Sequence, residues 1–328
     1  MKRILTGITP SGYPHLGNYI GAIKPSLDLL DEKCESFLFI ADLHALIKVW
    51  DTERLNKLSM QIAKAWLASG LNIEKTFFYR QSDIPEITDL TWILSCVTEK
   101  GLLNRSHAFK AAIDSNKESG KKDHEEGISM GLFSYPLLMA CDILTPNATH
   151  VPVGKDQQQH LEITRDIAQK FNSRYQEIFN IPEPVISSDK LVLGIDGRKM
   201  SKSYNNIIPL LGTDEELKNS VLKIVTNSQK PGEKKDWKEN TLFSIYSSFA
   251  DERQIEDLKN KFEEGIGWGD AKLIVYEDLN KILSPIKDEF ESLQSQEKNI
   301  EDMLQENAKK VRKITIPLIE RVKLAVGL

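Results

Sequence analysis

The first two thirds of the chain alternate short apolar runs with longer periodic segments. Apolar runs at 3–6, 37–40, 76–79 and 150–153 predict buried strands. Apolar positions with helical spacing between them, such as those in 54–67, predict helices. Strands that alternate with helices are typical of a parallel sheet covered by helices. Residues 1–204 are therefore expected to form an α/β domain.

The pattern changes after residue 204, where helical periods continue without strand-like runs. Thr213 and Glu216 have the spacing of a capping box, which predicts a helix that runs to about Val225. Asp251 begins another predicted helix, and the segments 272–282 and 300–313 are also periodic. Residues 205–328 are therefore expected to form a second, all-helical domain.

Composition narrows the class of protein. A chain of 328 residues with 40% hydrophobic content can bury a core large enough for two domains. Its three cysteines show neither paired nor metal-ligand spacing, and the amino terminus does not resemble a signal peptide. No apolar run reaches membrane-spanning length. We expect a soluble, cytoplasmic protein with no membrane association and no structural metal.

Charge gives no support for nucleic-acid binding by the chain as a whole. The formal net charge is -5, and residues 205–328 contain 19 Lys and Arg against 23 Asp and Glu. One local cluster of cations stands out, and it is equally typical of an ordinary solvated helix face. The cluster is Lys309, Lys310, Arg312, Lys313, Arg321 and Lys323.

The segment Lys199–Ser203 sets two lysines among small hydroxyl residues. It follows the flexible stretch 194–198, which contains two glycines. Lysine ammonium groups and serine hydroxyls are suited to a pyrophosphate on which charge builds up. An ordinary solvated loop would have the same composition.

A second motif, His15–Asn18, lies near the amino terminus. It follows the first predicted strand and the turn-rich loop 7–12, and it precedes a periodic segment. His15 to Asn18 therefore fall at the first turn of a predicted helix, where backbone amides and the helix dipole favour an anion. A helix start with an exposed histidine remains the alternative interpretation.

Two further segments carry candidate chemistry. Asp142 is a single carboxylate in the apolar helical stretch 135–144, so it needs a donor, either an indole N–H or a structural partner. The segment 150–160 predicts a strand, a turn and a helix, with Asp156 near the N-cap. Such a turn suits a ribose or an amino group, although an aspartate at this position is commonly only a cap.

The two loop motifs resemble the HIGH and KMSKS signatures of class I aminoacyl-tRNA synthetases, with Asn18 in place of the second histidine. Most of the chain further resembles the bacterial tryptophanyl-tRNA synthetases. The blocks that carry this resemblance are Thr6–Gly12, Gly17–Ala22, Ala41–Ala45, Met139–Leu144, Val151–Gln157 and Leu161–Asp166.

The resemblance implies a Rossmann-like catalytic domain over 1–204 and a helical tRNA anticodon-binding domain over 205–328. The catalytic residues that it implies are His15, Asn18, Lys199 and Lys202. It places ATP among Thr9, Pro10, Ser11, Gly17, Asn18, Gly154, Lys155, Asp156, Leu191, Lys199, Met200, Ser201, Lys202 and Ser203. It assigns tryptophan to Asp142, Tyr135, Met139, Val151, Val153 and Gln157. Many members have Gln at position 9 and Glu at position 155, so position 155 is expected to act through its backbone.

The implied reaction is the ATP-dependent activation of L-tryptophan to tryptophanyl-adenylate, followed by transfer to tRNA(Trp). Mg²⁺ would accompany ATP, and the resemblance implies a homodimer. The nearest rival is a tyrosyl-tRNA synthetase, since an aspartate also accepts from a phenol. Met139-Ala140-Cys141 favours tryptophan, because tyrosyl enzymes typically carry Gln-Ala-Tyr there. A small nucleotidylyltransferase would not explain the helical domain, and a non-catalytic synthetase-like protein tends to lose the motifs.

Overall fold

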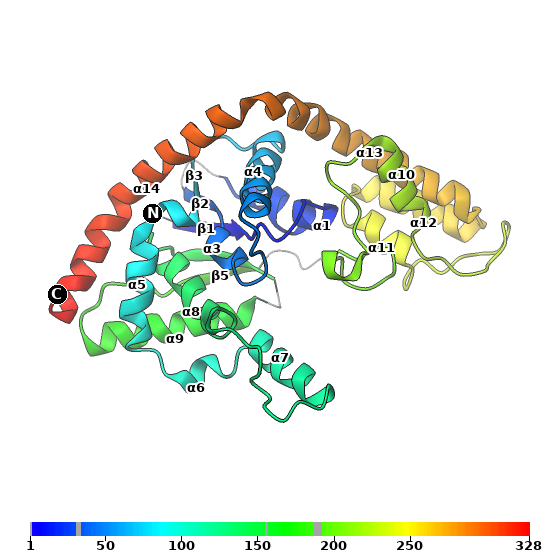
Figure 1. The fold of residues 1–328 in the computed structure, drawn as a ribbon. Helices are drawn as coiled ribbons and strands as arrows, with labels where there is room; N and C mark the ends of the chain where they lie inside the picture. The colour runs from blue at the N-terminus through cyan, green and yellow to red at the C-terminus, as the bar shows by residue number, and fades with distance from the viewer. Residues whose placement is uncertain (1, 31–33, 155–156, 187–191) are drawn as a thin grey trace.

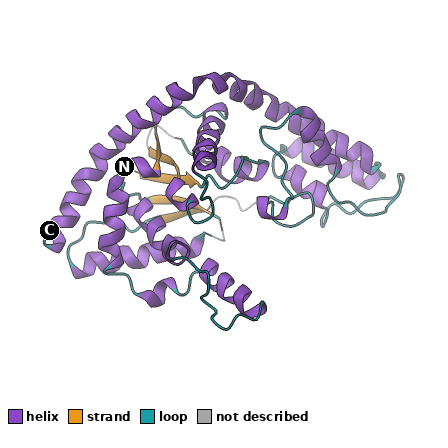
Figure 2. Cartoon of the chain, viewed as in Figure 1, coloured by secondary structure: helices purple, strands orange, loops and turns teal. Residues whose placement is uncertain are grey.

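The computed structural model of the chain contains one parallel sheet (Figure 2). It describes residues 2–30, 34–154, 157–186 and 192–328. The strands run in the order β3-β2-β1-β4-β5, and every neighbouring pair is parallel. Their bounds are β1 (Lys2–Ile8), β2 (Cys34–Ile40), β3 (Thr76–Arg80), β4 (His150–Val153) and β5 (Glu183–Ile186). The predicted α/β fold is confirmed.

The strand order reverses its direction at β1. From β1 the chain moves outward through β2 and β3, and it later returns to the other side of β1 with β4 and β5. At such a reversal the loops that leave neighbouring strands diverge, and a crevice opens beyond the carboxyl ends. The His15–Asn18 motif follows β1 and the loop after it, so it lies on the side of the sheet where β1 ends, as such a crevice requires.

Strand β5 was not expected from the sequence. Prolines at 182 and 184 weaken the strand pattern, because proline cannot donate a hydrogen bond to a neighbouring strand. In the described sheet β5 lies at the edge, with Pro184 paired to Val151. A proline is tolerated in an edge strand, because an edge strand has a neighbour on one side only and the missing N–H can lie on the open side.

Helices cover both faces of the sheet, and alternate side chains of each strand belong to different cores. Leu38 and Ile40 of β2 pack in one core with α4 (Thr52–Ala68). Phe37 and Phe39 pack in the other with α5 (Pro85–Ser95), α8 (Met130–Leu144) and α9 (Gln158–Arg174). Shorter elements connect these layers: α1 (Leu16–Asn18), η1 (Tyr19–Ile23), α2 (Lys24–Asp28), α3 (Asp42–Ala45), η2 (Gln81–Asp83), α6 (Lys100–Leu103), α7 (His107–Glu118) and η3 (Lys202–Tyr204).

Beyond residue 204 the chain has helices and no strand (Figure 1), as the pattern predicted. The helices are α10 (Asp214–Leu222), α11 (Thr241–Ser247), α12 (Glu252–Glu264), α13 (Trp268–Ser292), η4 (Leu293–Gln296) and α14 (Glu297–Val326). Thr213 and Glu216 form the predicted capping box, and Asp251 caps α12. Helix α10 ends at Leu222, three residues before the expected end. Helices α13 and α14 extend well beyond the predicted segments 272–282 and 300–313.

Helix α14 returns along the α/β half and ends beside α5 (Figure 1). Its side chains pair with that half: Glu301 with Arg80, Arg312 with Glu86, and Lys323 with Asp89. Arg312 and Lys323 of the cation cluster therefore already face carboxylates, and so does Lys309, which pairs with Glu306. Among the helices that the structure describes, none is both long and apolar enough to cross a membrane.

Candidate active site

The two loop motifs are in direct contact, although almost two hundred residues separate them in the sequence. A Cβ atom added to Gly12 would lie 2.6 Å from Lys202 Cδ, so the lysine side chain lies across this glycine. A Cβ atom on Gly17 would lie 3.0 Å from His15 Nδ1 and 3.4 Å from Met200 Sδ. The absence of a side chain at both glycines lets the motifs pack together at the crevice.

His15 is buried and is the N-cap residue of α1. Burial and, secondly, the charge of Lys202 lower its pKa to about 4. The imidazole is therefore neutral near pH 7, with one donor and one acceptor nitrogen. Among the described residues, its Nδ1 has no hydrogen-bond partner. A neutral ring with an unused nitrogen can bond a phosphate oxygen without adding a permanent charge.

The start of α1 is less open than the sequence suggested. The Leu16 amide donates to the Ile208 carbonyl at 2.9 Å, and the His15 amide donates to Asn18 Oδ1 at 3.1 Å. The expectation that these amides face an anion is wrong for both, because the chain around 208–209 packs against the helix start. The Asn18 carboxamide closes its own turn through the same bond. The Asn18 amide is also engaged, since it donates to the His15 carbonyl at 2.8 Å, so an anion at this motif would mainly meet side chains.

The Lys199–Lys202 segment is anchored by its methionine. The Met200 amide donates to the Val192 carbonyl at 2.9 Å, and its side chain is buried in the core. Lys199 is exposed, whereas Lys202 is half-buried. Burial lowers the pKa of Lys202 to about 8. Of the remaining residues predicted here, Leu191 and the Ser203 side chain lie outside the described part of the chain.

Asp142 is 1% exposed and uses both carboxylate oxygens in hydrogen bonds. Gln81 Nε2 donates to Oδ1 at 2.7 Å, and His44 Nε2 lies 2.8 Å from Oδ2. An ionised carboxylate only accepts, so His44 Nε2 donates in this contact when Asp142 is ionised. Burial raises the pKa of Asp142, while the bonds from His44 and Gln81 act in the opposite direction. Each oxygen keeps a second lone pair, so the structural partners do not exhaust its capacity to accept a ligand N–H.

His44 and Gln81 received no role from the sequence, although both support Asp142. Gln81 also accepts from the Leu43 amide at 3.0 Å, which fixes the orientation of its side-chain amide. His44 lies just after β2 and Gln81 just after β3. Polar residues that follow buried parallel strands meet at one edge of the sheet. This position after a strand is the sequence signal that could have identified His44 and Gln81.

The other residues predicted for tryptophan lie around the same helix and strand. The Tyr135 hydroxyl lies 2.9 Å from His160 Nε2, and its ring lies edge-on to His44 with the centroids 6.4 Å apart. His160 is 5% exposed, as expected for a packed helix residue. Val151 and Val153 are buried on one face of β4, and the partly buried Met139 packs against the same core.

Less can be stated about the turn between β4 and α9 and about the loop after β1. Gln157 caps α9, and its amide donates to the Gly154 carbonyl at 2.9 Å. Lys155 and Asp156 lie outside the described residues, and so does the expected Asp156 cap. After β1, Thr9 and Ser11 are exposed, Pro10 is buried, and the Ser11 amide donates to the Thr9 carbonyl at 2.8 Å.

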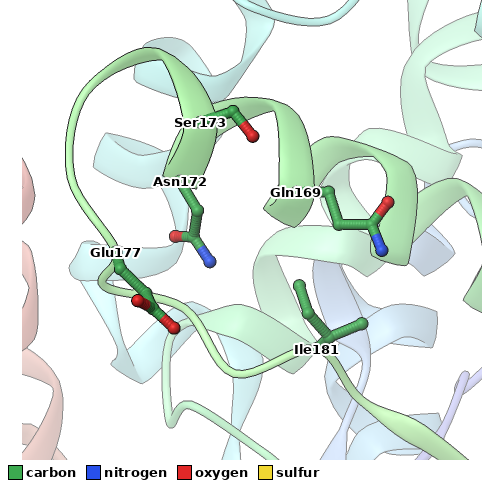
Figure 3. Close-up of a pocket in the computed structure, with 5 residues that line it drawn as sticks. All are labelled: Gln169, Asn172, Ser173, Glu177 and Ile181. Atoms are coloured by element: carbon green, nitrogen blue, oxygen red, sulfur yellow. The ribbon is translucent and has the colours of Figure 1, made fainter.

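A separate hollow lies at the end of α9 and carries no comparable chemistry (Figure 3). Its residues are Gln169, Asn172, Ser173, Glu177 and Ile181. Asn172, one of its polar side chains, already bonds the Phe179 carbonyl and the amides of Ile178 and Phe179. The hollow is therefore part of a stabilised loop, and the candidate site lies at the strand ends.

Comparisons with known proteins identify the family of this chain. The family model for class I tRNA synthetases (W and Y) matches residues 1–284. A tryptophan–tRNA ligase of Bordetella parapertussis is 50% identical over 330 residues, which span 99% of this chain and 73% of the relative. The tryptophanyl-tRNA synthetase of Campylobacter jejuni, solved with ADP and tryptophan, superposes with a TM-score of 0.86 at 39% identity, covering 99% of this chain and 100% of that one.

The tyrosyl alternative has much weaker support. A tyrosyl-tRNA synthetase of Archaeoglobus fulgidus, solved with L-tyrosine, reaches a TM-score of 0.66 at 20% identity, and a likeness at this level shows the fold alone. With the family match over 1–284 and 50% identity to a curated relative, this chain belongs to the class I aminoacyl-tRNA synthetases and, within them, to the tryptophan–tRNA ligases.

Proposed function

We propose that the crevice at the strand ends activates tryptophan with ATP, through the residues that the two motifs and Asp142 bring there. The tryptophan carboxylate would attack the α-phosphate in line, form tryptophanyl-adenylate and release pyrophosphate. No side chain needs to become covalently attached, so the protein acts by proximity and by stabilising charge. The packing of Lys202 across Gly12, in the loop before His15, and of Met200 against Gly17 is the observation that carries this proposal, because it brings the two motifs into one site.

On the tryptophan side, Asp142 would accept the indole N–H. His44 and Gln81 hold the carboxylate in place, and its burial leaves few competing water molecules. Three apolar side chains, Met139, Val151 and Val153, would enclose the ring, while Tyr135 and Gln157 would face the amino-acid head group. The Campylobacter jejuni relative, solved with tryptophan and ADP, supports a site for both substrates.

On the phosphate side, His15, Asn18, Lys199 and Lys202 would surround the reacting phosphates. The neutral His15 ring would donate one hydrogen bond, and the two lysines would follow the departing pyrophosphate. Mg²⁺ would arrive with ATP and keep much of its own water. No cluster of three His, Cys, Asp or Glu suited to a metal occurs among the described residues. The Ser201 and Ser203 hydroxyls would also contact the pyrophosphate, the other ATP residues named from the sequence would surround the nucleotide, and Leu191 would contact adenine through its backbone.

The affinity of the free enzyme for ATP is expected to fall as the pH rises through about 8. Lys202 is protonated below its pKa of about 8 and neutral above it, so its attraction for the phosphates is lost on the alkaline side. The ATP dissociation constant, measured by calorimetry between about pH 7 and pH 9.5, tests this. Lys202→Arg keeps its charge over this range and should flatten the profile. A parent profile that is already flat would contradict the assignment.

Residues 205–328 would bind the anticodon of tRNA(Trp), and the tRNA terminal ribose would take the acyl group and release AMP. The helical fold of this segment and the full-length similarity to the Campylobacter jejuni synthetase support this assignment. The net charge of this segment does not support tRNA binding, so any electrostatic attraction for the tRNA comes from local cations. Lys310, Lys313 and Arg321 are the cluster members that form no ion pair among the described residues. We place the enzyme in the reducing cytoplasm, in keeping with three free cysteines.

The enzyme is expected to be a homodimer in solution. Large apolar side chains are exposed on one chain, with Trp92 on α5 at 74% and Met130 at the start of α8 at 73%. Trp50 is 85% exposed as well. Gly131 lies against Ile47, so the segment that contains Trp50 lies close to the start of α8. Such exposed apolar groups are typical of a protein interface. Light scattering should give twice the mass of one chain.

A matched pair of variants tests where that interface lies. Trp92→Lys is expected to shift the mass towards one chain, because it would place a charge in an apolar contact. Leu222→Lys, at an exposed apolar position on α10, should leave the mass unchanged. A parent protein with the mass of one chain would contradict the dimer.

A further inference from the structure

One buried amide lies directly beneath the Lys199–Lys202 segment and was not assigned a role by the sequence. Asn206 is 1% exposed, whereas the neighbouring Asn205 is exposed and has a left-handed φ of 51°. The sharp turn at Asn205 ends η3 and directs the next residue back under the loop. Asn206 therefore lies in the space enclosed by Lys199–Lys202, the segment whose lysines are proposed to contact the departing pyrophosphate.

The Asn206 carboxamide bonds three separate points of this loop. Its Oδ1 accepts from the Ser201 amide at 2.7 Å. Its Nδ2 donates to the Lys199 carbonyl at 3.1 Å and to Asp196 Oδ1 at 2.7 Å. Both N–H donors are used, so the side chain is fixed in position and in orientation. The bonds at Lys199 and Ser201 lie on either side of Met200, whose side chain is buried in the core.

The fit around this amide is too close for a larger neighbour. A Cβ atom added to Gly194 would lie 2.3 Å from both Asn206 Cγ and Nδ2. The Ile195 amide also donates to the Asn206 carbonyl at 2.9 Å. Gly194 therefore lets the turn close over Asn206, and the backbone of Asn206 completes the contact.

Asp196 decides which way the carboxamide faces. Its carboxylate only accepts, so the amide must turn Nδ2 towards it, and this leaves Oδ1 towards the Ser201 amide. The bond from Asn206, together with bonds from Arg198, lowers the pKa of Asp196 to about 2, against the opposing effect of its partial burial. Arg198 pairs with Asp196 at 2.6 Å, and its guanidinium lies 4.4 Å from the centre of the Tyr204 ring. The loop is thus held by a network of its own polar side chains.

We propose that Asn206 is a positioning residue for adenylate formation, which holds the backbone at Lys199 and Ser201 so that both lysines reach the phosphates. The proposal rests on the proposed role of Lys199 and Lys202. Fixing the groups on either side of Met200 determines where the two lysine side chains leave the backbone. A shift of about 1 Å in such a constellation can slow a reaction by about 10²-fold.

The test is Asn206→Asp, which keeps the size of the side chain and the acceptor for the Ser201 amide. It replaces both N–H donors by an oxygen that faces the Asp196 carboxylate and the Lys199 carbonyl, so the loop should be released. In ATP–pyrophosphate exchange, kcat/KM for ATP is expected to fall about 10²-fold while the KM for tryptophan stays close to that of the parent. Trypsin should cleave faster after Arg198, Lys199 or Lys202. Asn205→Gly keeps the left-handed turn and should behave as the parent in both assays.

Two further variants keep the outcome decisive. Asp196→Asn alters the more exposed partner and should cause a smaller loss for ATP, even if Asn206→Asp fails to fold. The double variant Asp196→Asn with Asn206→Asp again places an amide donor opposite a carboxylate acceptor, and it should recover part of the activity. A loss that is equal for ATP and tryptophan, or an absence of loss in both single variants, overturns the proposal. If these variants match the parent while Lys202→Ala is impaired, only the role of Asn206 is wrong; if Lys202→Ala also matches the parent, the role of the loop is wrong too.

Discussion

Lys202→Ala is expected to slow adenylate formation by about 10²–10³-fold while tryptophan binding stays nearly normal. Lys202 is half-buried, lies across Gly12 and faces the same crevice as His15. Its ammonium group would stabilise the charge that develops on the leaving pyrophosphate, a contribution that matters most in the transition state. ATP–pyrophosphate exchange measures the reaction, and quenching of protein fluorescence or calorimetry measures tryptophan binding.

Controls separate this effect from a general effect of lost charge. Lys223→Ala removes an exposed lysine at the end of α10 and should leave the exchange rate unchanged. Lys202→Arg should recover part of the rate, because the charge is kept although the geometry differs. An exchange rate for Lys202→Ala that equals the parent rate would show that this lysine has no role in the reaction.

Asp142→Asn is expected to lower kcat/KM for tryptophan by about 10²-fold, since a hydrogen bond to a charged group contributes about 1.5–3 kcal/mol. An asparagine has one accepting oxygen, whereas Gln81 and His44 each bond a separate oxygen of Asp142. The indole N–H would meet either an N–H group or a neutral oxygen that is already engaged. The KM for ATP should change little, because the phosphate motifs are untouched.

The parent assay and a distant variant serve as references for Asp142→Asn. Asp288→Asn removes an exposed carboxylate on α13 and should leave both substrates unaffected. Exchange should respond to tryptophan and not to tyrosine in the parent enzyme. A variant that folds normally, with the parent kcat/KM for tryptophan, would show that Asp142 serves only the fold.

The central elements of the fold were predictable because their signals are local. Strand β4 was predicted with its exact bounds, and the capping box at Thr213 fixes the start of α10, since both depend on residues a few positions apart. Strand β5 was missed because its prolines hide the strand pattern, and only its place at the sheet edge makes them acceptable. The return of α14 along the α/β half depends on pairs such as Arg312 with Glu86, which no periodic pattern reveals.

The sequence by itself determined the family, the alternation of the first four strands with helices, and the two loops that are proposed to carry the phosphate chemistry. Only the tertiary structure decided that Lys202 lies across Gly12, that His44 and Gln81 hold Asp142, and that Asn206 supports the loop. The physical reason is the range of each interaction. Periodicity and capping act over a few residues, whereas the charge and orientation of a site depend on which distant strand ends meet and on how much water they exclude.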